Sequence, residues 1–330
     1  MEQHASIASY VWFLTKPGFE SWLGAFEWFM RKILFFTSPI WAFGSIHNAL
    51  IKRLRPYGIH ADLLDWSVNY TPEAFAHFQR IYDYFLVSPD SLHILHRPDQ
   101  YCVPLDRIIS VAHHMEDFAI AAERMGGLGC FDELAAFGAV HQHLADRAAA
   151  LGIRRSVPVV INGVETDMFH NAPAAELRNV GHVGGHKLHR VNGEDCKRPE
   201  LADRVFQDLP LTLKSSNASH YLAMPARYWE VDATLVTSSY ESCGMPYLES
   251  AAAGRLVVGT PTGYFEQHHA GLGAVCRMDP EQFVQDARAT LLYYRDSPIQ
   301  YRQRCQEGQD YCRQHFDWSW TIDTWLEIFS

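Results

Sequence analysis

Two glutamates near the end of the chain have the spacing and the surroundings to bind a sugar. Glu241 and Glu249 are separated by seven residues, and Gly244, Met245 and Pro246 lie between them, ahead of a run of small residues. Carboxylates accept hydrogen bonds from hydroxyl groups, and a glycine lets the backbone approach a ligand closely. A helix that begins after this turn presents unpaired N–H groups and a partial positive charge, which attract phosphate.

Apolar stretches on both sides indicate the structure that positions this motif. Residues 233–237 and 255–259 both have the composition of buried strands. The predicted order is therefore strand, acidic loop, helix N-terminus and strand. Without these flanking strands, the two carboxylates would be interpreted as a solvated loop acid and a helix-surface acid.

Residues 239–254 resemble the E-x7-E motif of retaining glycosyltransferases with the GT-B fold, and of glycosyltransferase family 4 in particular. Residues 260–266 are similar to the next loop of that family, where a Gly-Gly-x-x-Glu type of turn is usual. The resemblance covers the chain from about Asn162 to its end, and before that point it is weaker and mostly architectural.

The resemblance implies an α/β protein of two facing Rossmann-like domains with a cleft between them, and 330 residues suit two domains of ordinary size. We expect an N-terminal extension over residues 1–29, an acceptor-side domain over 30–170, a nucleotide-sugar donor domain over 171–312, and a terminal helix over 313–330 that crosses back to the first domain. Strand-like and helix-like segments alternate along the chain, and this order favours parallel sheets with helices on both faces. Further strands are expected at residues 30–37, 61–66, 107–112, 157–161, 180–183 and 210–214.

The resemblance also implies which residues bind the donor phosphates. Lys197 matches the family's phosphate-binding lysine, but the basic position expected before it holds Asn192, with Arg190 two residues earlier. Either Arg190 or Lys187 supplies the missing charge from a longer loop, or the phosphate site is weaker than usual. In the N-terminal half, Gly44 at a helix start would add N–H donors, where the family often has two glycines.

The two glutamates take different roles by the same resemblance. Glu241 would contact the hydroxyls of the donor sugar together with backbone N–H groups near Gly244 and Met245, and Glu249 would hold the ribose diol. Cys243 lies inside the motif and is included in the donor site, but the pattern places no partner histidine for thiol chemistry.

A pair of histidines, His113 and His114, follows the strand predicted at 107–112. Sites in open α/β sheets cluster at the carboxyl ends of strands, and similar enzymes place a histidine there, near the donor sugar and the acceptor. We therefore include both as candidate catalytic residues with Glu241. His113 is favoured because it follows the strand directly, and His114 is the alternative.

Metal and cofactor motifs are not found in the sequence. It contains no D-x-D and no H-E-x-x-H, and the two histidines of His141-Gln142-His143 would point to different faces of a helix. Since GT-B enzymes commonly work without a bound metal, we expect neither a metal nor a cofactor besides the nucleotide-sugar substrate.

Composition excludes several other classes of protein. A net charge of −10 gives no support for nucleic-acid binding, and no apolar run reaches the roughly 20 residues that span a bilayer. Seven cysteines without C-x-x-C spacing favour free thiols in a reducing cytoplasm, and the first residues lack the basic region of a signal peptide.

Residues 1–29 and the residue after them carry an apolar stripe at helical spacing, formed by Phe19, Trp22, Leu23, Phe26, Phe29 and Met30. One interpretation is an interfacial helix that makes a peripheral contact at the inner face of the membrane, near a lipid-linked acceptor. The other is a helix packed on the protein or on a second subunit. Acidic residues on the opposite face favour the second interpretation.

The function that these features predict is retaining transfer of a sugar from a nucleotide-diphosphate sugar to a hydroxyl acceptor, in the biosynthesis of a glycan, polysaccharide or glycolipid. A sugar-nucleotide epimerase of the same fold is an alternative. A phosphorylase would need a pyridoxal lysine constellation that the sequence does not show. A catalytically silent partner that binds nucleotide sugars is the third alternative, and Asn192 and the single glycine at position 44 are its support.

Overall fold

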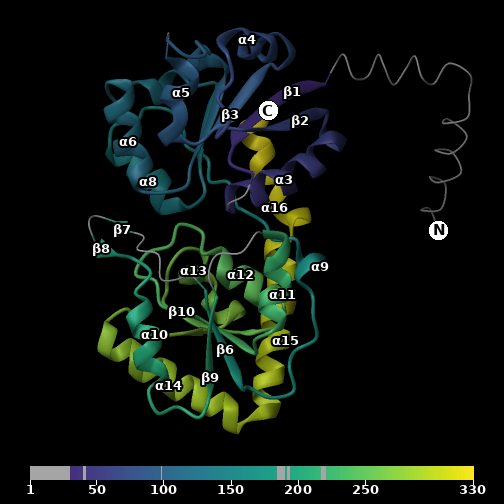
Figure 1. Ribbon diagram of the computed structural model, residues 1–330, viewed down its shortest axis with the longest axis vertical. Coiled ribbons are helices and arrows are strands. Elements are labelled where there is room, and N and C mark those ends of the chain that lie inside the picture. Colours follow the sequence, from purple (N-terminus) through teal and green to yellow (C-terminus); the bar gives the residue numbers. More distant parts are fainter. Residues whose placement is uncertain (1–29, 40–41, 98, 184–189, 192–193, 217–220) are drawn as a thin grey trace, which may run out of the picture.

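The computed structural model describes residues 30–39, 42–97, 99–183, 190–191, 194–216 and 221–330. Two five-stranded parallel sheets form the centres of two stacked domains, and the chain completes most of the upper domain in Figure 1 before it enters the lower one. The predicted extension over residues 1–29 lies outside the described residues. Within the described part of the chain, no helix is long and apolar enough to cross a membrane.

The first sheet has the strand order β2-β1-β3-β4-β5, with all neighbours parallel. Its strands are β1 (Arg31–Thr37), β2 (Ile59–Asp65), β3 (Tyr84–Val87), β4 (Ile108–Ala112) and β5 (Ala136–Ala139). The helices of this half of the chain are α3 (Ala42–Leu54), α4 (Pro72–Ile81), α5 (Leu92–His96), α6 (Glu116–Met125), α7 (Cys130–Glu133) and α8 (Gln142–Ala150). Helix α4 begins at an N-cap, where the Thr71 side chain accepts a hydrogen bond from the Ala74 N–H at 3.2 Å.

The second sheet has the order β12-β11-β10-β6-β9 and is also parallel. Its strands are β6 (Asn179–Val183), β9 (Thr212–Ser216), β10 (Ala233–Val236), β11 (Leu256–Gly259) and β12 (Ala274–Val275), and β7 (Arg190–Val191) pairs with β8 (Glu194–Asp195) in a separate hairpin. The helices after α8 are α9 (Thr166–Phe169), α10 (Pro199–Phe206), α11 (Met224–Trp229), α12 (Met245–Ala252), α13 (Tyr264–Leu272), α14 (Pro280–Asp296), α15 (Pro298–Phe316) and α16 (Trp318–Phe329).

Both sheets place their third strand on the other side of the first, so the strand order reverses between β1 and β3 and again between β6 and β10. Ligands of open parallel sheets bind outside the carboxyl ends of the strands at this point of reversal. The loop after β10 carries Glu241, and the loop after β4 carries His113. The topology therefore directs the chemistry-bearing residues of both halves to the space between the domains.

Helix α16 returns from the second domain and packs on the first (Figure 1). The Trp325 indole N–H donates to the Ile161 carbonyl at 3.2 Å, and the Ile161 N–H donates to Thr324 Oγ1 at 2.9 Å. The Phe329 ring lies 6.1 Å from Phe35 of β1, centroid to centroid. The last helix of the chain therefore supplies part of the core of the first domain.

One predicted strand is wrong. Residues 157–161 contribute a single bridge, between Val159 and Ala139, because Pro158 has no N–H to donate to a ladder. The fifth strand of the sheet is instead β5, whose Ala-Phe-Gly-Ala sequence gives little strand signal. The strands expected at 30–37, 61–66, 107–112, 180–183, 210–214, 233–237 and 255–259 are confirmed within a few residues.

Candidate functional site

A cavity of about 260 Å³ lies between the carboxyl edges of the two sheets. From the first domain it is lined by Ile46 of α3, His113 and His114, and from the segment that joins the domains by Asn162. The second domain contributes Lys197 and the continuous stretch 241–246. Most of the residues that the sequence singled out from distant parts of the chain therefore meet in this one cavity.

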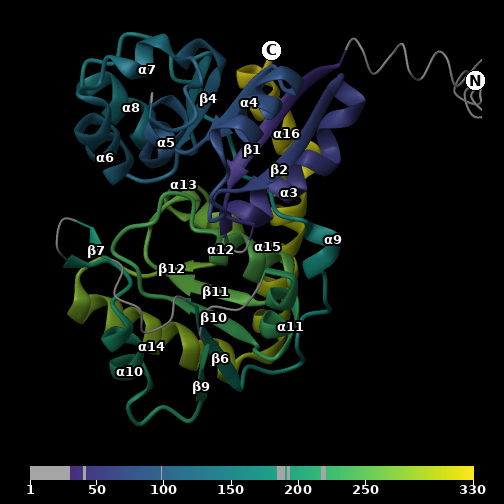
Figure 2. The same ribbon diagram turned by 45° about the horizontal axis from the view of Figure 1, so that its top comes forward.

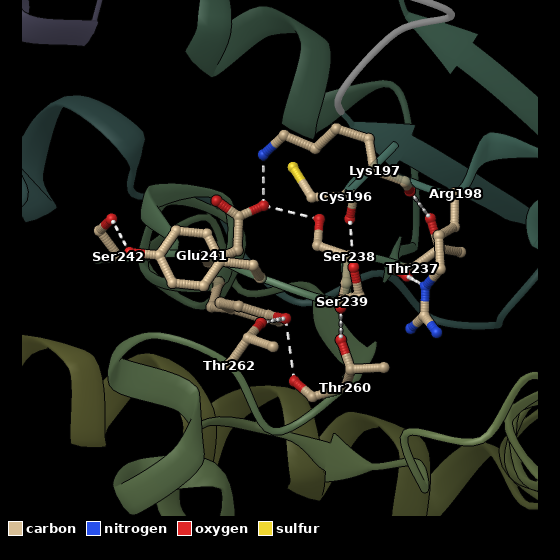
Figure 3. A network of polar contacts seen from close by, with 12 residues as sticks. Cys196, Lys197, Arg198, Thr237, Ser238, Ser239, Glu241, Ser242, Thr260 and Thr262 are labelled. Atoms are coloured by element: carbon tan, nitrogen blue, oxygen red, sulfur yellow. Dashed lines mark hydrogen bonds and ion pairs between the residues drawn. The ribbon is translucent and has the colours of Figure 1, made fainter. Parts of the chain in front are cut away.

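Lys197 and Glu241 form an ion pair at the centre of the site (Figure 3). Glu241 Oε1 accepts from the Lys197 ammonium and also from the Ser238 hydroxyl, the latter at 2.7 Å. The side chains keep 21% and 13% of their exposure, so the pair is largely shielded but still reaches solvent. The cavity wall therefore carries a cationic side chain, Lys197, beside an anionic one, Glu241.

Hydrogen bonds between two loops place these side chains side by side. The Ser239 N–H donates to the Cys196 carbonyl at 2.7 Å, and Arg198 Nε donates to the Thr237 carbonyl at 2.7 Å (Figure 3). The segment that carries Lys197 is therefore fastened to the loop after β10. This tertiary pairing, rather than sequence proximity, sets the distance between Lys197 and Glu241.

Gly244 starts helix α12 in a conformation that favours glycine, with φ of 70° and ψ of 51°. A Cβ at this position would lie 2.5 Å from Cδ2 of Tyr247. The Tyr247 ring has little room to move, because its hydroxyl bonds the Thr260 carbonyl at 2.9 Å and its ring stacks on Phe265 at 4.4 Å. Pro246 occupies one of the first two helical positions. Gly244 and Met245 line the cavity, so the N-terminus of α12 faces it.

We expect Gly244→Ala to destabilise the fold by more than the roughly 1–2 kcal/mol that a left-handed conformation costs a non-glycine residue. Gly152 provides the matched control, because its φ is 84° and a Cβ added there would meet no heavy atom within 4 Å beyond its chain neighbours. Chemical denaturation of Gly244→Ala and Gly152→Ala measures the loss of unfolding free energy in each. The difference between the two losses is the contribution of the clash with Tyr247. Equal losses of unfolding free energy would mean that Tyr247 moves aside freely.

Cys243 is buried beside the cavity, and its Sγ lies 3.2 Å from Asn162 Nδ2. Burial raises the pKa of its thiol to about 12, so the thiol stays protonated at neutral pH. Cys243 is therefore a packing and hydrogen-bonding residue of the wall and not an activated nucleophile.

Asn162 is a site residue that sequence reasoning missed. Its side chain is fully buried and lines the cavity, and its Oδ1 has no hydrogen-bond partner among the described residues. Its backbone N–H donates to the Tyr264 hydroxyl at 2.8 Å, which fixes it at the junction of the domains. A buried amide oxygen without a partner is costly unless a ligand or water bonds it. The available signal was an amide residue directly after an apolar run.

His113 and His114 are held by a buried carboxylate. Oδ2 of Asp117 accepts the backbone N–H of His113 at 2.7 Å and that of His114 at 2.9 Å. Burial raises the pKa of Asp117 to about 7, and it lowers the pKa of His113 well below its usual range. The His113 imidazole is therefore neutral at physiological pH and can exchange hydrogen bonds without carrying charge.

Two of the candidate residues do not line the cavity. Gly44 is buried in the first turn of α3, two residues before the lining residue Ile46. Glu249 is only 7% exposed, and its Oε2 accepts from the buried Tyr228 hydroxyl at 2.9 Å. Arg190 lies in β7, and neither its side chain nor Asn192 belongs to the described part of the structure.

The expectation that His141 and His143 point to different faces of a helix is wrong. His141 is extended and precedes α8, so its ring lies 4.3 Å from that of His143, centroid to centroid. In the described part of the chain, no group of three or more His, Cys, Asp or Glu side chains is arranged to hold a metal ion.

Two parallel sheets of one topology, stacked around an interdomain site, define the GT-B class of fold, and this class was predicted from the sequence. No protein-family model matches the chain, and no curated protein matches it. Several solved structures do match it. HepE from Anabaena, in complex with UDP and glucose, is 14% identical with a TM-score of 0.64, and the match covers 91% of this chain and 99% of that one.

Two further structures agree. Sucrose-phosphate synthase from Thermosynechococcus elongatus is 11% identical with a TM-score of 0.65, over 91% of this chain and 98% of that one. The catalytic domain of starch synthase IV from Arabidopsis thaliana, bound to ADP and acarbose, is 9% identical with a TM-score of 0.65, over 91% and 99%. At these identities the similarity establishes the GT-B fold, and it carries no residue roles across.

Proposed function

We propose that the protein is a retaining glycosyltransferase that moves a sugar from a nucleoside-diphosphate sugar to a hydroxyl acceptor. The observation that carries the proposal is the meeting of a cation, a carboxylate and a helix N-terminus in one interdomain cavity. Lys197 and the N-terminus of α12 are suited to a diphosphate, and Glu241 is suited to sugar hydroxyls. The structures of similar fold that hold UDP or ADP support this class of ligand.

In the proposed reaction, the acceptor oxygen bonds to the anomeric carbon on the face from which the diphosphate departs. The bond from that carbon to the phosphate oxygen breaks, and its electron pair stays on the phosphate. Lys197 and the N–H groups of α12 stabilise the developing negative charge. The departing phosphate oxygen takes the proton of the acceptor. Burial lowers the pKa of His113, so its imidazole is neutral. His113 therefore acts as a hydrogen-bonding group near the reacting carbon and not as a strong base.

Glu249 is proposed to hold the ribose diol through the carboxylate oxygen that Tyr228 does not bond. Among the described residues, the Tyr228 hydroxyl is the hydrogen-bond partner found for Glu249, and it occupies Oε2. A diol needs a carboxylate that accepts two hydrogen bonds, so one oxygen must remain accessible to the ligand. Gly44 and Arg190 are proposed to approach the phosphates only if the domains or the β7–β8 hairpin move on binding.

The acceptor is proposed to be a glycan or a lipid-linked hydroxyl, and the enzyme to act in the cytoplasm in glycan, polysaccharide or glycolipid biosynthesis. A peripheral membrane contact through residues 1–29 belongs to the same proposal. These points rest on the resemblance of the motif at 239–254 and on free thiols at all seven cysteines.

A thermal-shift panel of UDP-, GDP- and ADP-sugars tests the proposal, beginning with UDP-glucose and ADP-glucose. We expect one nucleotide class to raise the melting temperature of the wild-type protein, and the shift to disappear in Lys197→Ala. Slow release of free sugar from that donor without acceptor would identify an active enzyme. Binding without any sugar release would support the silent partner, and no shift with any donor would contradict the donor site.

A further inference from the structure

The acidic and basic side chains of the interdomain cavity cancel each other. Among the described residues that line it, Lys197 is the only lysine or arginine, and Glu241 is the only aspartate or glutamate. The His113 imidazole is neutral, because burial lowers its pKa well below the usual range. In Figures 1 and 2, α12, which begins just after Glu241, lies at the edge of the second domain that faces the first. A diphosphate that enters here therefore meets a cation whose charge is already neutralised.

The neutralisation is local, because the two charges belong to one ion pair. Glu241 Oε1 accepts from the Lys197 ammonium and, at 2.7 Å, from the Ser238 hydroxyl (Figure 3). Both side chains are largely shielded from solvent, so water and salt screen their attraction only in part. The carboxylate thus occupies the ammonium that a diphosphate would otherwise use in full.

Lys197 is held in place without the help of Glu241. Its carbonyl accepts from the Thr237 hydroxyl at 2.5 Å, and its N–H donates to Asp195 Oδ1 at 3.0 Å. Arg198, the next residue, donates from Nε to the Thr237 carbonyl at 2.7 Å. Because these bonds fix the backbone that carries the ammonium, the ion pair is not needed to bring Lys197 to the cavity. Its main effect on an anionic ligand is therefore competition.

The sugar of a bound donor would weaken this competition. In the proposed function, sugar hydroxyls donate to Glu241, and each such bond satisfies a lone pair of the carboxylate that would otherwise face the ammonium. After the transfer, those hydroxyls leave with the acceptor, whereas the diphosphate remains beside Lys197. The carboxylate has then lost its sugar partners, and the ammonium is again the cation within its reach.

We infer that Glu241 competes with the diphosphate for Lys197 and thereby expels the spent nucleotide after the sugar has been transferred. This inference rests on the proposed function, and it gives Glu241 a second role besides its contact with the sugar. The site would then bind the loaded donor in preference to the nucleoside diphosphate. Weak binding of the spent nucleotide accelerates product release, a step that limits kcat in many enzymes.

The test measures the affinities of UDP, ADP, GDP and inorganic pyrophosphate by ligand-observed NMR, which reaches millimolar dissociation constants. Glu241→Gln keeps the shape of the side chain and removes its charge. We expect this variant to bind the preferred nucleoside diphosphate about three- to tenfold more tightly than wild type, as suits the loss of one partly shielded ion pair. Its affinity for the matching nucleotide sugar should not rise by the same factor, because an amide accepts hydroxyl hydrogen bonds less strongly.

Two further proteins separate competition at Lys197 from general repulsion by a carboxylate. In a Lys197→Ala background, Glu241→Gln has no pair to release, so its gain should fall below about twofold or disappear with binding itself. Glu281→Gln is the matched control, because Glu281 pairs with Arg204 at 2.6 Å in the same domain and does not line the cavity. This control should bind every ligand as wild type does.

Equal or weaker binding of the nucleoside diphosphate by Glu241→Gln would overturn the inference, and so would a full gain in the Lys197→Ala background. The proposed function survives either result if the wild-type protein transfers sugar. Conversely, a gain that depends on Lys197 in a protein without any transfer or sugar release would support the competition and contradict the proposed function. If Glu241→Gln binds none of the four ligands, both are wrong.

Discussion

Lys197→Ala is expected to lower the rate of glycosyl transfer about 10²- to 10³-fold, the loss seen when one preorganised donor to a developing anion is removed. Lys197 supplies the ammonium that lines the interdomain cavity, and it already pairs there with Glu241. In the proposed reaction the diphosphate leaves with an additional negative charge at this point. Without the ammonium, that charge is stabilised only by backbone N–H groups and water.

Steady-state kinetics with the donor found by thermal shift will measure this effect, and kcat should fall together with kcat/KM. Lys214→Ala is the matched control, because Lys214 also lies in the second domain but is exposed and donates to the Glu230 carbonyl at 2.8 Å. Lys197→Arg should recover part of the rate, since it keeps the charge but not the shape. A Lys197→Ala enzyme within about threefold of wild type would remove Lys197 from the phosphate site.

Glu249→Gln is expected to stabilise the folded protein at neutral and alkaline pH. Burial raises the pKa of Glu249 from 4.5 to about 7, and the hydrogen bond from Tyr228 only partly offsets this. The folded protein therefore binds the proton more tightly than the unfolded chain, so stability falls as pH rises from about 4.5 to about 7. At about 1.4 kcal/mol per pKa unit, the full loss is about 3 kcal/mol.

The measurement is the free energy of unfolding of Glu249→Gln minus that of wild type, across the range from about pH 4.5 to about pH 8. This difference should grow up to about pH 7 and then level off. Asp117 acts in the same direction, because burial raises its pKa as well, and the lowered pKa values of His47 and His113 act in the opposite direction. These contributions are common to both proteins and cancel in the difference.

Glu123→Gln, at an exposed position of α6, is the control for the substitution itself. The same Glu249→Gln protein should bind the donor more weakly, since a neutral amide accepts hydrogen bonds from a diol less strongly than a carboxylate. A stabilised variant that binds the donor as well as wild type would show that Glu249 has no role at the ribose.

The fold and the centre of the site could be predicted because they depend on repeated local patterns. Residues 233–259 encode a strand, a turn with glycine and proline, a helix and a second strand in the order that parallel sheets require. Once that order is accepted, Glu241 and His113 must both lie at carboxyl ends of strands. Their approach to one cavity depends on the two domains facing each other, which the resemblance of residues 239–254 implied.

The rest of the site could not be predicted because it depends on tertiary contacts. Nothing local to Asp117 indicates that its carboxylate bonds the backbone of His113 and His114. The sequence pattern indicates only that Asn162 follows an apolar run, and the structure places it at the junction of the domains. The geometry of His141 and His143 depends on one residue of helix boundary, since α8 begins at Gln142 and leaves His141 extended.

The return of α16 to the first domain has a consequence for how the protein is made. Trp325 and Phe329 are almost completely buried, and Phe329 packs against Phe35 near the beginning of the described chain. Domains usually fold one after another as they leave the ribosome, with the N-terminal domain first. Here the first domain cannot complete its core until the last helix, of 12 residues, has been synthesised. The part of its core that Trp325 and Phe329 fill must therefore stay incomplete while the entire second domain is translated.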